Sequence, residues 1–240
     1  MTVRLSRSSA RALIFSLILT SALGAQDFWL NKEFNRWNDD ELKRITTDSP
    51  WAKSTTMATR APGGGGFDLG ASAGGDDGGG DSGGGGGGSR GGRGGGGGAT
   101  PTMSLVLSWQ SALPMKQANV RMKMNGPGDV PADARDYLAG ADPAYIILIE
   151  GMPQNLARQV LRDTEKLKKS AIKVGKREIP LARLSTNPHG RNLDFVMFFD
   201  RKDPIRIEDN EVEVDARLGM FELKKKFKLK DMVVNGKLEM

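Results

Sequence analysis

The sequence contains no cysteine and a single histidine, and both shortages narrow the chemistry open to it. Without cysteine there is no disulfide framework, no thiolate metal site, no cysteine nucleophile and no cysteine to carry a lipid. His189 stands in the loop-forming segment Asn-Pro-His-Gly with no triad motif beside it, which is typical of a surface residue. Metal binding is thereby left to carboxylates. We expect no catalytic residue, no metal ligand and no cofactor, and therefore a protein that is not an enzyme.

Long apolar runs are also lacking. The run ALIFSLIL at residues 12–19 is too short for a bilayer-spanning helix, which needs about 20 residues. It follows three arginines and precedes a stretch of small residues that ends at Ala25, which is the order of a secretory signal peptide. Residues 1–25 are therefore predicted to be a signal peptide, cleaved after Gly24 or Ala25, with an uncleaved anchor as the alternative. The mature protein is expected in the periplasm or outside the cell, with no later transmembrane segment and no lipid anchor.

The basic excess is small once this leader is removed. The full chain has 35 Lys and Arg against 29 Asp and Glu, a net charge of +6. The leader holds three of the arginines and no acid, so the mature chain keeps 32 basic residues and a net charge of about +3. This weak balance, together with export, argues against a nucleic-acid partner.

Glycine is concentrated in one tract, residues 61–99, which we interpret as a disordered low-complexity segment because it has almost nothing apolar to bury. A phosphate-binding loop would need Lys-Ser or Lys-Thr at its end, and a calcium-binding repeat would need a fixed period. Two arginines, Arg90 and Arg93, neutralise few phosphates, so an RGG-type nucleic-acid segment is disfavoured. The tract is a solvated spacer or, if its flanking strands pair, an oversized hairpin loop.

The arm before this tract, residues 26–60, is rich in tryptophan. Asn38 and Glu41 have the spacing of a capping box, with Trp37 and Leu42 in the positions of a hydrophobic staple, and Pro50 ends the helix. Residues 54–59 are a candidate strand that would pair with residues 102–110. The arm is too short to form its own core, so it either docks on the following domain, which we favour, or binds a partner through its three tryptophans, Trp29, Trp37 and Trp51.

Residues 100–240 have the patterning of an α+β domain. For the protein as a whole, including the helix of the arm, we expect an α+β fold with a mainly antiparallel sheet and two to four helices, interrupted by the long disordered glycine-rich insertion. Alternating or continuous apolar residues predict strands at 103–110, 145–149, 172–174, 179–184 and 193–199. Helices are predicted at 111–124, capped by Ser111, at 131–139 and at 154–169. Residues 187–190 are predicted to be a loop. The acids between positions 200 and 209 alternate with basic residues, which indicates a charged turn rather than a metal site.

The most specific pattern is a hairpin over residues 211–229 with a two-residue turn at Gly219-Met220. Its register sets three acids of one strand opposite three lysines of the other, namely Asp215 with Lys224, Glu213 with Lys226 and Glu211 with Lys228. Lys225 faces inward. A solvated structural face is the default interpretation of these lysines, and Lys225 and Lys230 remain the candidate anion-binding residues.

Two passages, residues 48–53 (DSPWAK) and 227–233 (FKLKDMV), the second followed by GKL at 236–238, resemble a family of exported bacterial proteins with a Trp-rich start and a hairpin-rich end. The resemblance implies a bacterial exported origin and no particular activity. Our leading hypothesis is a non-catalytic envelope or secreted protein that binds another macromolecule, a protein or envelope partner, through the Trp arm. The alternatives are an anion or polysaccharide binder and a hydrolase with an unrecognised carboxylate site.

Overall fold

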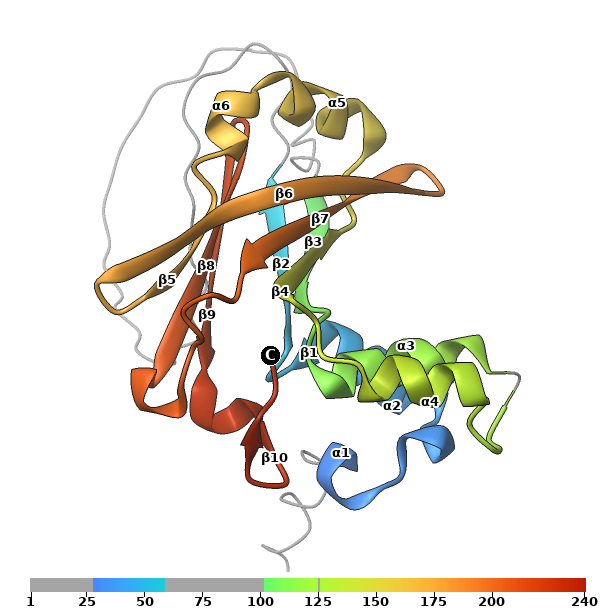
Figure 1. Cartoon of the computed structure of the whole chain (residues 1–240). Helices are drawn as coiled ribbons and strands as arrows, with labels where there is room; N and C mark the ends of the chain where they lie inside the picture. The colour runs from blue at the N-terminus through green and yellow to red at the C-terminus, as the bar shows by residue number, and fades with distance from the viewer. Residues whose placement is uncertain (1–27, 59–101, 125) are drawn as a thin grey trace, which may run out of the picture.

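A computed structural model describes residues 28–58, 102–124 and 126–240, so the predicted signal peptide and the whole of the glycine tract lie outside the described residues. The described chain forms a nine-stranded antiparallel sheet in the order β1-β2-β3-β4-β7-β6-β5-β8-β9, with helices grouped around it (Figure 1). This confirms the α+β class. The strands are β1 (Asp48–Ser49), β2 (Ala52–Ala58), β3 (Thr102–Trp109), β4 (Ala144–Glu150), β5 (Ala171–Val174), β6 (Arg177–His189), β7 (Asn192–Asp200), β8 (Glu211–Leu218) and β9 (Phe221–Lys228).

The tryptophan arm is part of the same sheet as the rest of the chain. Strand β2 pairs with β3 along its whole length, with Ala52 opposite Ser108 and Ala58 opposite Thr102. Residues 59–101 therefore connect two neighbouring strands. Helix α2 (Asp39–Thr47) begins with the predicted capping box, in which Asn38 Oδ1 accepts from Glu41 N–H at 2.9 Å. The helix ends before the short strand β1, as the proline at position 50 predicts.

The sheet rolls up around its core, because strands far apart in its order meet across the interior. The rings of Trp109 on β3 and Phe227 on β9 pack edge to face with centroids 5.8 Å apart. The C-terminus closes the roll beside β2, where the buried indole of Trp51 donates a hydrogen bond to the Glu239 carbonyl at 2.8 Å. A small hairpin of β10 (Val233–Val234) and β11 (Lys237–Leu238) leads to this contact. The core is therefore shared between the arm, the central strands and the last residues of the chain.

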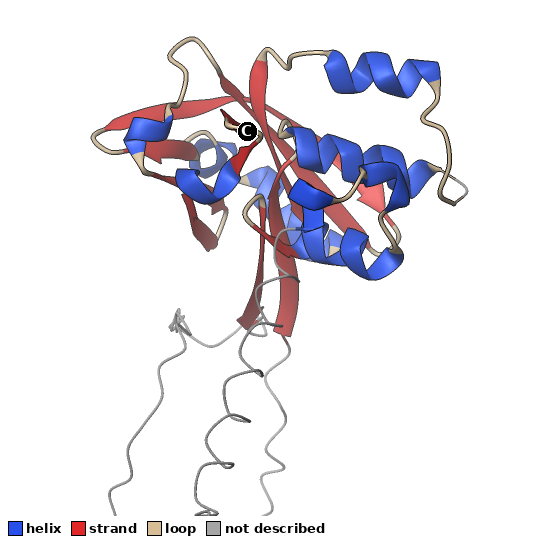
Figure 2. Ribbon diagram, turned by 90° about the horizontal axis from the view of Figure 1, so that it is seen from below, coloured by secondary structure: helices blue, strands red, loops and turns tan. Residues whose placement is uncertain are grey.

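The helices lie at two places on this sheet, as Figure 1 shows. Helices α2, α3 (Leu113–Lys123) and α4 (Ala132–Ala139) pack together, and α5 (Gln154–Arg162) with α6 (Thr164–Leu167) lies near the β8–β9 turn. Viewed from below, the larger helical group stands on one side of the strands (Figure 2). None of the helices in the described ranges has both the length and the apolarity that crossing a membrane requires.

The helix predictions need three corrections. The predicted helix at 154–169 is two helices, because Asp163 leaves the helical conformation and caps α6 by accepting from Lys166 N–H. Ala112 rather than Ser111 occupies the cap position of α3, and the Ser111 hydroxyl instead accepts from Ile146 N–H at 3.1 Å on β4. With the short helix α1 (Phe28–Asn31), the described residues hold six α-helices rather than two to four.

The β8–β9 hairpin has the predicted register, from Leu218 opposite Phe221 to Glu211 opposite Lys228, and Gly219 has the positive φ of 63° that its turn needs. Its ion pairs differ from the expected ones. The Asp215 carboxylate pairs with Lys173 of β5 at 2.9 Å and with Arg217 at 2.8 Å, and not with Lys224. The reason is topological, since β8 has β5 on its other side and the sequence pattern did not place it there.

Candidate functional site

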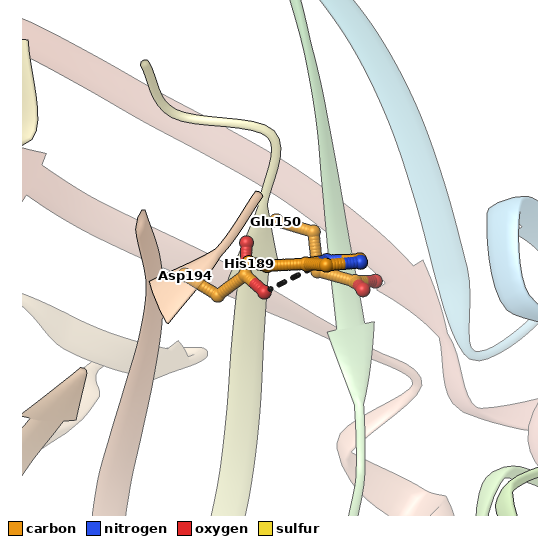
Figure 3. A group of neighbouring side chains, drawn as sticks. All are labelled: Glu150, His189 and Asp194. Carbon is orange, nitrogen blue, oxygen red and sulfur yellow. Dashed lines mark ion pairs between the residues drawn. The ribbon is translucent and has the colours of Figure 1, made fainter. Parts of the chain in front are cut away.

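Three side chains with metal-binding or acid–base chemistry meet at one end of the sheet, and we call them the Glu–His–Asp cluster (Figure 3). Glu150 is the last residue of β4, His189 the last of β6, and Asp194 lies near the start of β7. One ligand atom from each of the three residues, a ring nitrogen or a carboxylate oxygen, lies within 4.8 Å of the other two. Within the described residues they are the one such group of three. His189 is exposed, Glu150 half-buried and Asp194 buried, so the cluster opens to solvent on the histidine side.

The pairing of β4, β7 and β6 brings the cluster together. Ile149 pairs with Phe195, which puts the next residues of the two strands, Glu150 and Asp194, side by side on the face away from the core. Across the other edge of β7, His189 pairs with Asn192 at the tight turn. The prediction of a loop over residues 187–190 was therefore wrong for its first three residues, which continue β6 up to His189. The His189 Nδ1 atom lies 3.4 Å from Asp194 Oδ2.

Gly151 fixes the backbone just beyond Glu150. Its φ is +93°, and a Cβ atom built on it would lie 2.3 Å from the Ser104 carbonyl oxygen of β3. Only glycine fits both the conformation and the close approach. The Gly151 N–H points at Asp194 and donates to its Oδ1 atom at 3.3 Å, which leaves Oδ2 facing His189. The backbone N–H of Gly151, just after β4, thus sets the orientation of the Asp194 carboxylate on β7.

The β6–β7 turn is tied to the segment after β4. Leu193 N–H donates to the Met152 carbonyl at 2.8 Å, and Gln154 N–H donates to the Arg191 carbonyl at 3.1 Å. The Gln154 side chain also donates to the Gly190 carbonyl at 3.1 Å. These bonds hold the two segments that carry the cluster at a fixed distance.

Among the described residues, His189 is the one basic side chain that faces the two carboxylates of the cluster. Burial raises the pKa of the Glu150 carboxyl, and the neighbouring Asp194 charge raises this pKa further, while His189 acts in the opposite direction. In the described part of the chain no lysine or arginine pairs with either carboxylate. One imidazole and two carboxylates can hold a cation with mixed nitrogen and oxygen preference, or pass a proton among themselves.

A separate cavity of about 970 Å³ lies between α3, α4 and the sheet, and we call it the α3–α4 groove. Its rim carries the most exposed apolar side chains of this helical group, Met122 at 53% and Tyr137 at 47% exposed. One part of its wall is polar, because Asn119 donates to Gln110 at 2.7 Å and Gln110 donates to Ser108 at 2.8 Å. The lining residues are Gln110, Asn119, Val120, Met122, Lys123, Met124, Gly126, Pro127, Gly128, Asp129, Pro131, Asp133, Ala134, Tyr137 and Leu148.

The groove continues onto the outer face of the sheet. Leu148 lines the groove and pairs with Ser108 on one side and Val196 on the other. Half-buried apolar side chains cover this outer face of the three central strands, namely Val106, Ile146, Leu148, Val196 and Phe198. The Arg183 guanidinium stacks over the Phe198 ring at 3.6 Å and limits its exposure. A ligand lying in the groove would therefore meet a partly apolar sheet surface at the inner end.

The structure places two of the three candidate tryptophans in the core. Trp37 is 1% exposed and Trp51 is 0% exposed, and the Trp29 ring packs edge to face on Trp51 with centroids 5.6 Å apart. These side chains hold the arm on the sheet and, in this conformation, present little surface to a partner.

The two candidate anion-binding lysines differ in their exposure to solvent. Lys225 faces inward opposite Val214 as predicted, and both burial and the nearby Lys53 charge lower the pKa of its ammonium group. Lys230 is exposed, in the 3-10 turn that follows β9. In the predicted charged turn, Arg177 bonds to the carboxylates of both Asp203 and Asp209, the second at 2.9 Å.

Comparison of the chain with protein-family models, with curated proteins and with solved structures finds no match.

Sequence reasoning missed Glu150 and Asp194. Both stand at strand ends that are far apart in the chain, and only the β4–β7 pairing makes them neighbours. A local signal was present, because His189 and Asp194 flank a short Gly-containing segment whose ends a hairpin would bring together.

Proposed function

We propose that this chain is an exported, non-catalytic binding protein whose partner is a polypeptide with apolar side chains, held in the α3–α4 groove. The observation that carries the proposal is the groove itself, a cavity of about 970 Å³ with exposed Met122 and Tyr137 at its rim. Methionine side chains are flexible and polarisable, and they suit surfaces that adapt to varied apolar partners. A concave apolar site with a few polar groups is the usual form of a binding site.

The polar wall supports a peptide as the ligand. Gln110 and Asn119 carry carboxamides, which have the same donor and acceptor groups as a peptide backbone. The half-buried outer face of β3, β4 and β7 at the inner end of the groove extends the apolar surface beyond a small-molecule pocket. The burial of Trp37 and Trp51 moves the expected interaction surface away from the arm.

The test uses a library of random peptides displayed on phage, selected on the mature protein. Selected peptides are then measured against Met122→Glu, and against the matched control Met220→Glu, whose native methionine is 54% exposed at the distant β8–β9 turn. We expect Met122→Glu to weaken binding by about tenfold or more, which corresponds to about 1.4 kcal/mol, and Met220→Glu to leave it unchanged. A selection that enriches no peptide, or equal losses in the two variants, would refute the proposal.

A further inference from the structure

We propose that Glu150, His189 and Asp194 form a binding site for a divalent transition-metal ion, and that Zn²⁺ is the ion that suits them best. Zinc is bound by imidazole nitrogen and carboxylate oxygen at about 2.0–2.2 Å, so two ligands of a tetrahedral site lie about 3.4 Å apart. The His189 Nδ1 and Asp194 Oδ2 atoms are already 3.4 Å apart. One ligand atom from each of the three residues lies within 4.8 Å of the other two, so the remaining adjustment is a small rotation of the exposed His189 or of the Glu150 side chain.

The charge of the cluster fits a cation. Two carboxylates stand side by side on neighbouring strands, and in the described chain neither has a lysine or arginine partner. An acid pair of this kind repels itself, and a dication removes the repulsion. The single imidazole favours zinc over magnesium or calcium, which prefer oxygen ligands alone.

The surroundings of Asp194 resemble those of an oriented metal ligand rather than those of a freely moving surface carboxylate. Gly151 N–H donates to Asp194 Oδ1 and leaves Oδ2 available on the side of His189. Outer hydrogen bonds of this kind orient metal ligands and contribute to affinity. The ties between the segment after β4 and the β6–β7 turn keep the two halves of the site in register.

The site has three protein ligands and an exposed side. Because the His189 side chain is 75% exposed, solvent reaches the position that a fourth ligand would take. A site with three protein ligands leaves room for water or for a donor group from a bound molecule. The site lies on the sheet end and is lined by none of the groove residues, so it goes beyond the proposed peptide binding.

The experiment relies on His189 being the only histidine in the sequence. Protein prepared without a histidine tag shows only one set of imidazole ring signals in its proton NMR spectrum. Zn²⁺ is titrated at pH 7, with Mg²⁺ as the ion control. We expect the imidazole signals to shift and to saturate at one equivalent of Zn²⁺, and to be unaffected by the same concentration of Mg²⁺.

Variants then separate three-ligand binding from a lone histidine. Glu150→Gln and Asp194→Asn keep the shape of each side chain, and each is expected to weaken Zn²⁺ binding by about tenfold or more, since even outer-shell losses cost 10–100-fold. Glu208→Gln, at an exposed acid outside the cluster, is the matched control and should bind like the wild type. Tryptophan fluorescence confirms that each variant is folded, and Glu150→Gln, which removes a charge disfavoured by burial, is expected to fold.

The proposal is overturned if the imidazole signals do not saturate, or if Glu150→Gln and Asp194→Asn both bind Zn²⁺ as tightly as Glu208→Gln. Either result would mean that His189 and Asp194 form only a surface ion pair.

Discussion

Replacing Gly151 by alanine tests the local geometry on which the Glu–His–Asp cluster depends. Two costs add at this position. The φ of +93° strains any residue with a Cβ atom, by about 1–2 kcal/mol. The added methyl group would also lie 2.3 Å from the Ser104 carbonyl oxygen, so β3 or the segment after β4 must move, at a cost of about 1–3 kcal/mol for overpacking. We therefore expect Gly151→Ala to lower the free energy of unfolding by about 2–5 kcal/mol.

Gly175→Ala is the matched control. Gly175, in the β5–β6 turn, also has a positive φ, +57°, but nothing lies within 4 Å of a Cβ atom built on it. It should lose only the conformational cost of about 1–2 kcal/mol. The difference between the two variants thus isolates the close approach to Ser104.

Urea unfolding followed by tryptophan fluorescence measures both variants, because Trp37, Trp51 and Trp109 are buried and report the loss of the core. Gly151→Ala should unfold at a clearly lower urea concentration than Gly175→Ala. Equal midpoints with equal slopes would refute the reasoning, since they would mean that the strands accommodate the methyl group without strain.

Two further predictions concern buried charge. Burial raises the pKa of the Asp215 carboxyl, but hydrogen bonds from Lys173 and Arg217 outweigh burial and hold this pKa below its ordinary value of 3.8. The ionised carboxylate therefore stabilises the fold above pH 3.8, and this stabilisation is lost as the pH falls through the lowered pKa. We expect Asp215→Asn to be less stable than the wild type near neutrality, by about 1–3 kcal/mol, and to lose less of its stability in acid. The same loss of stability in acid for variant and wild type, measured by urea unfolding at several pH values, would contradict this. The lowered pKa of Lys225 means that the fold disfavours its charged form at neutral pH. Lys225→Met should therefore raise the urea midpoint at pH 7, whereas the control Lys230→Met, at an exposed site, should not. The wild type should gain stability relative to Lys225→Met as the pH rises through the lowered pKa toward 10.5, and a destabilised Lys225→Met would show that the lysine has a partner.

Local patterns in the sequence predicted much of the fold. The capping box at Asn38 and Glu41, the central strand β7 and the register of the β8–β9 hairpin all follow from residues close together in the chain. The pairing of β2 with β3 was foreseen as one of two alternatives, because strand propensity alone does not say whether two strands separated by some forty residues are neighbours.

Local sequence patterns did not predict the Glu–His–Asp cluster. Its two carboxylates become neighbours through the β4–β7 pairing, and local patterns do not show that, among the described residues, no lysine or arginine pairs with them. The same limit explains the ion pair between Asp215 and Lys173, since the position of β5 beside β8 has no local signal. The break at Asp163 was missed for another reason: Asp is a poor helix former but is common at caps, and a continuous apolar face concealed it.

The contact of Trp51 with the last residues of the chain determines when this fold can be completed. The indole N–H and the Glu239 carbonyl are 188 residues apart in sequence. Strand β2, which follows Trp51, lies near one edge of the sheet, between β1 and β3. During synthesis the arm therefore emerges from the ribosome well before its buried hydrogen-bond partner, which is made 188 residues later. Folds dominated by such distant contacts form slowly, because loop closure precedes the gain from packing. A nascent chain of this protein therefore cannot complete its core until residue 239 has left the ribosome.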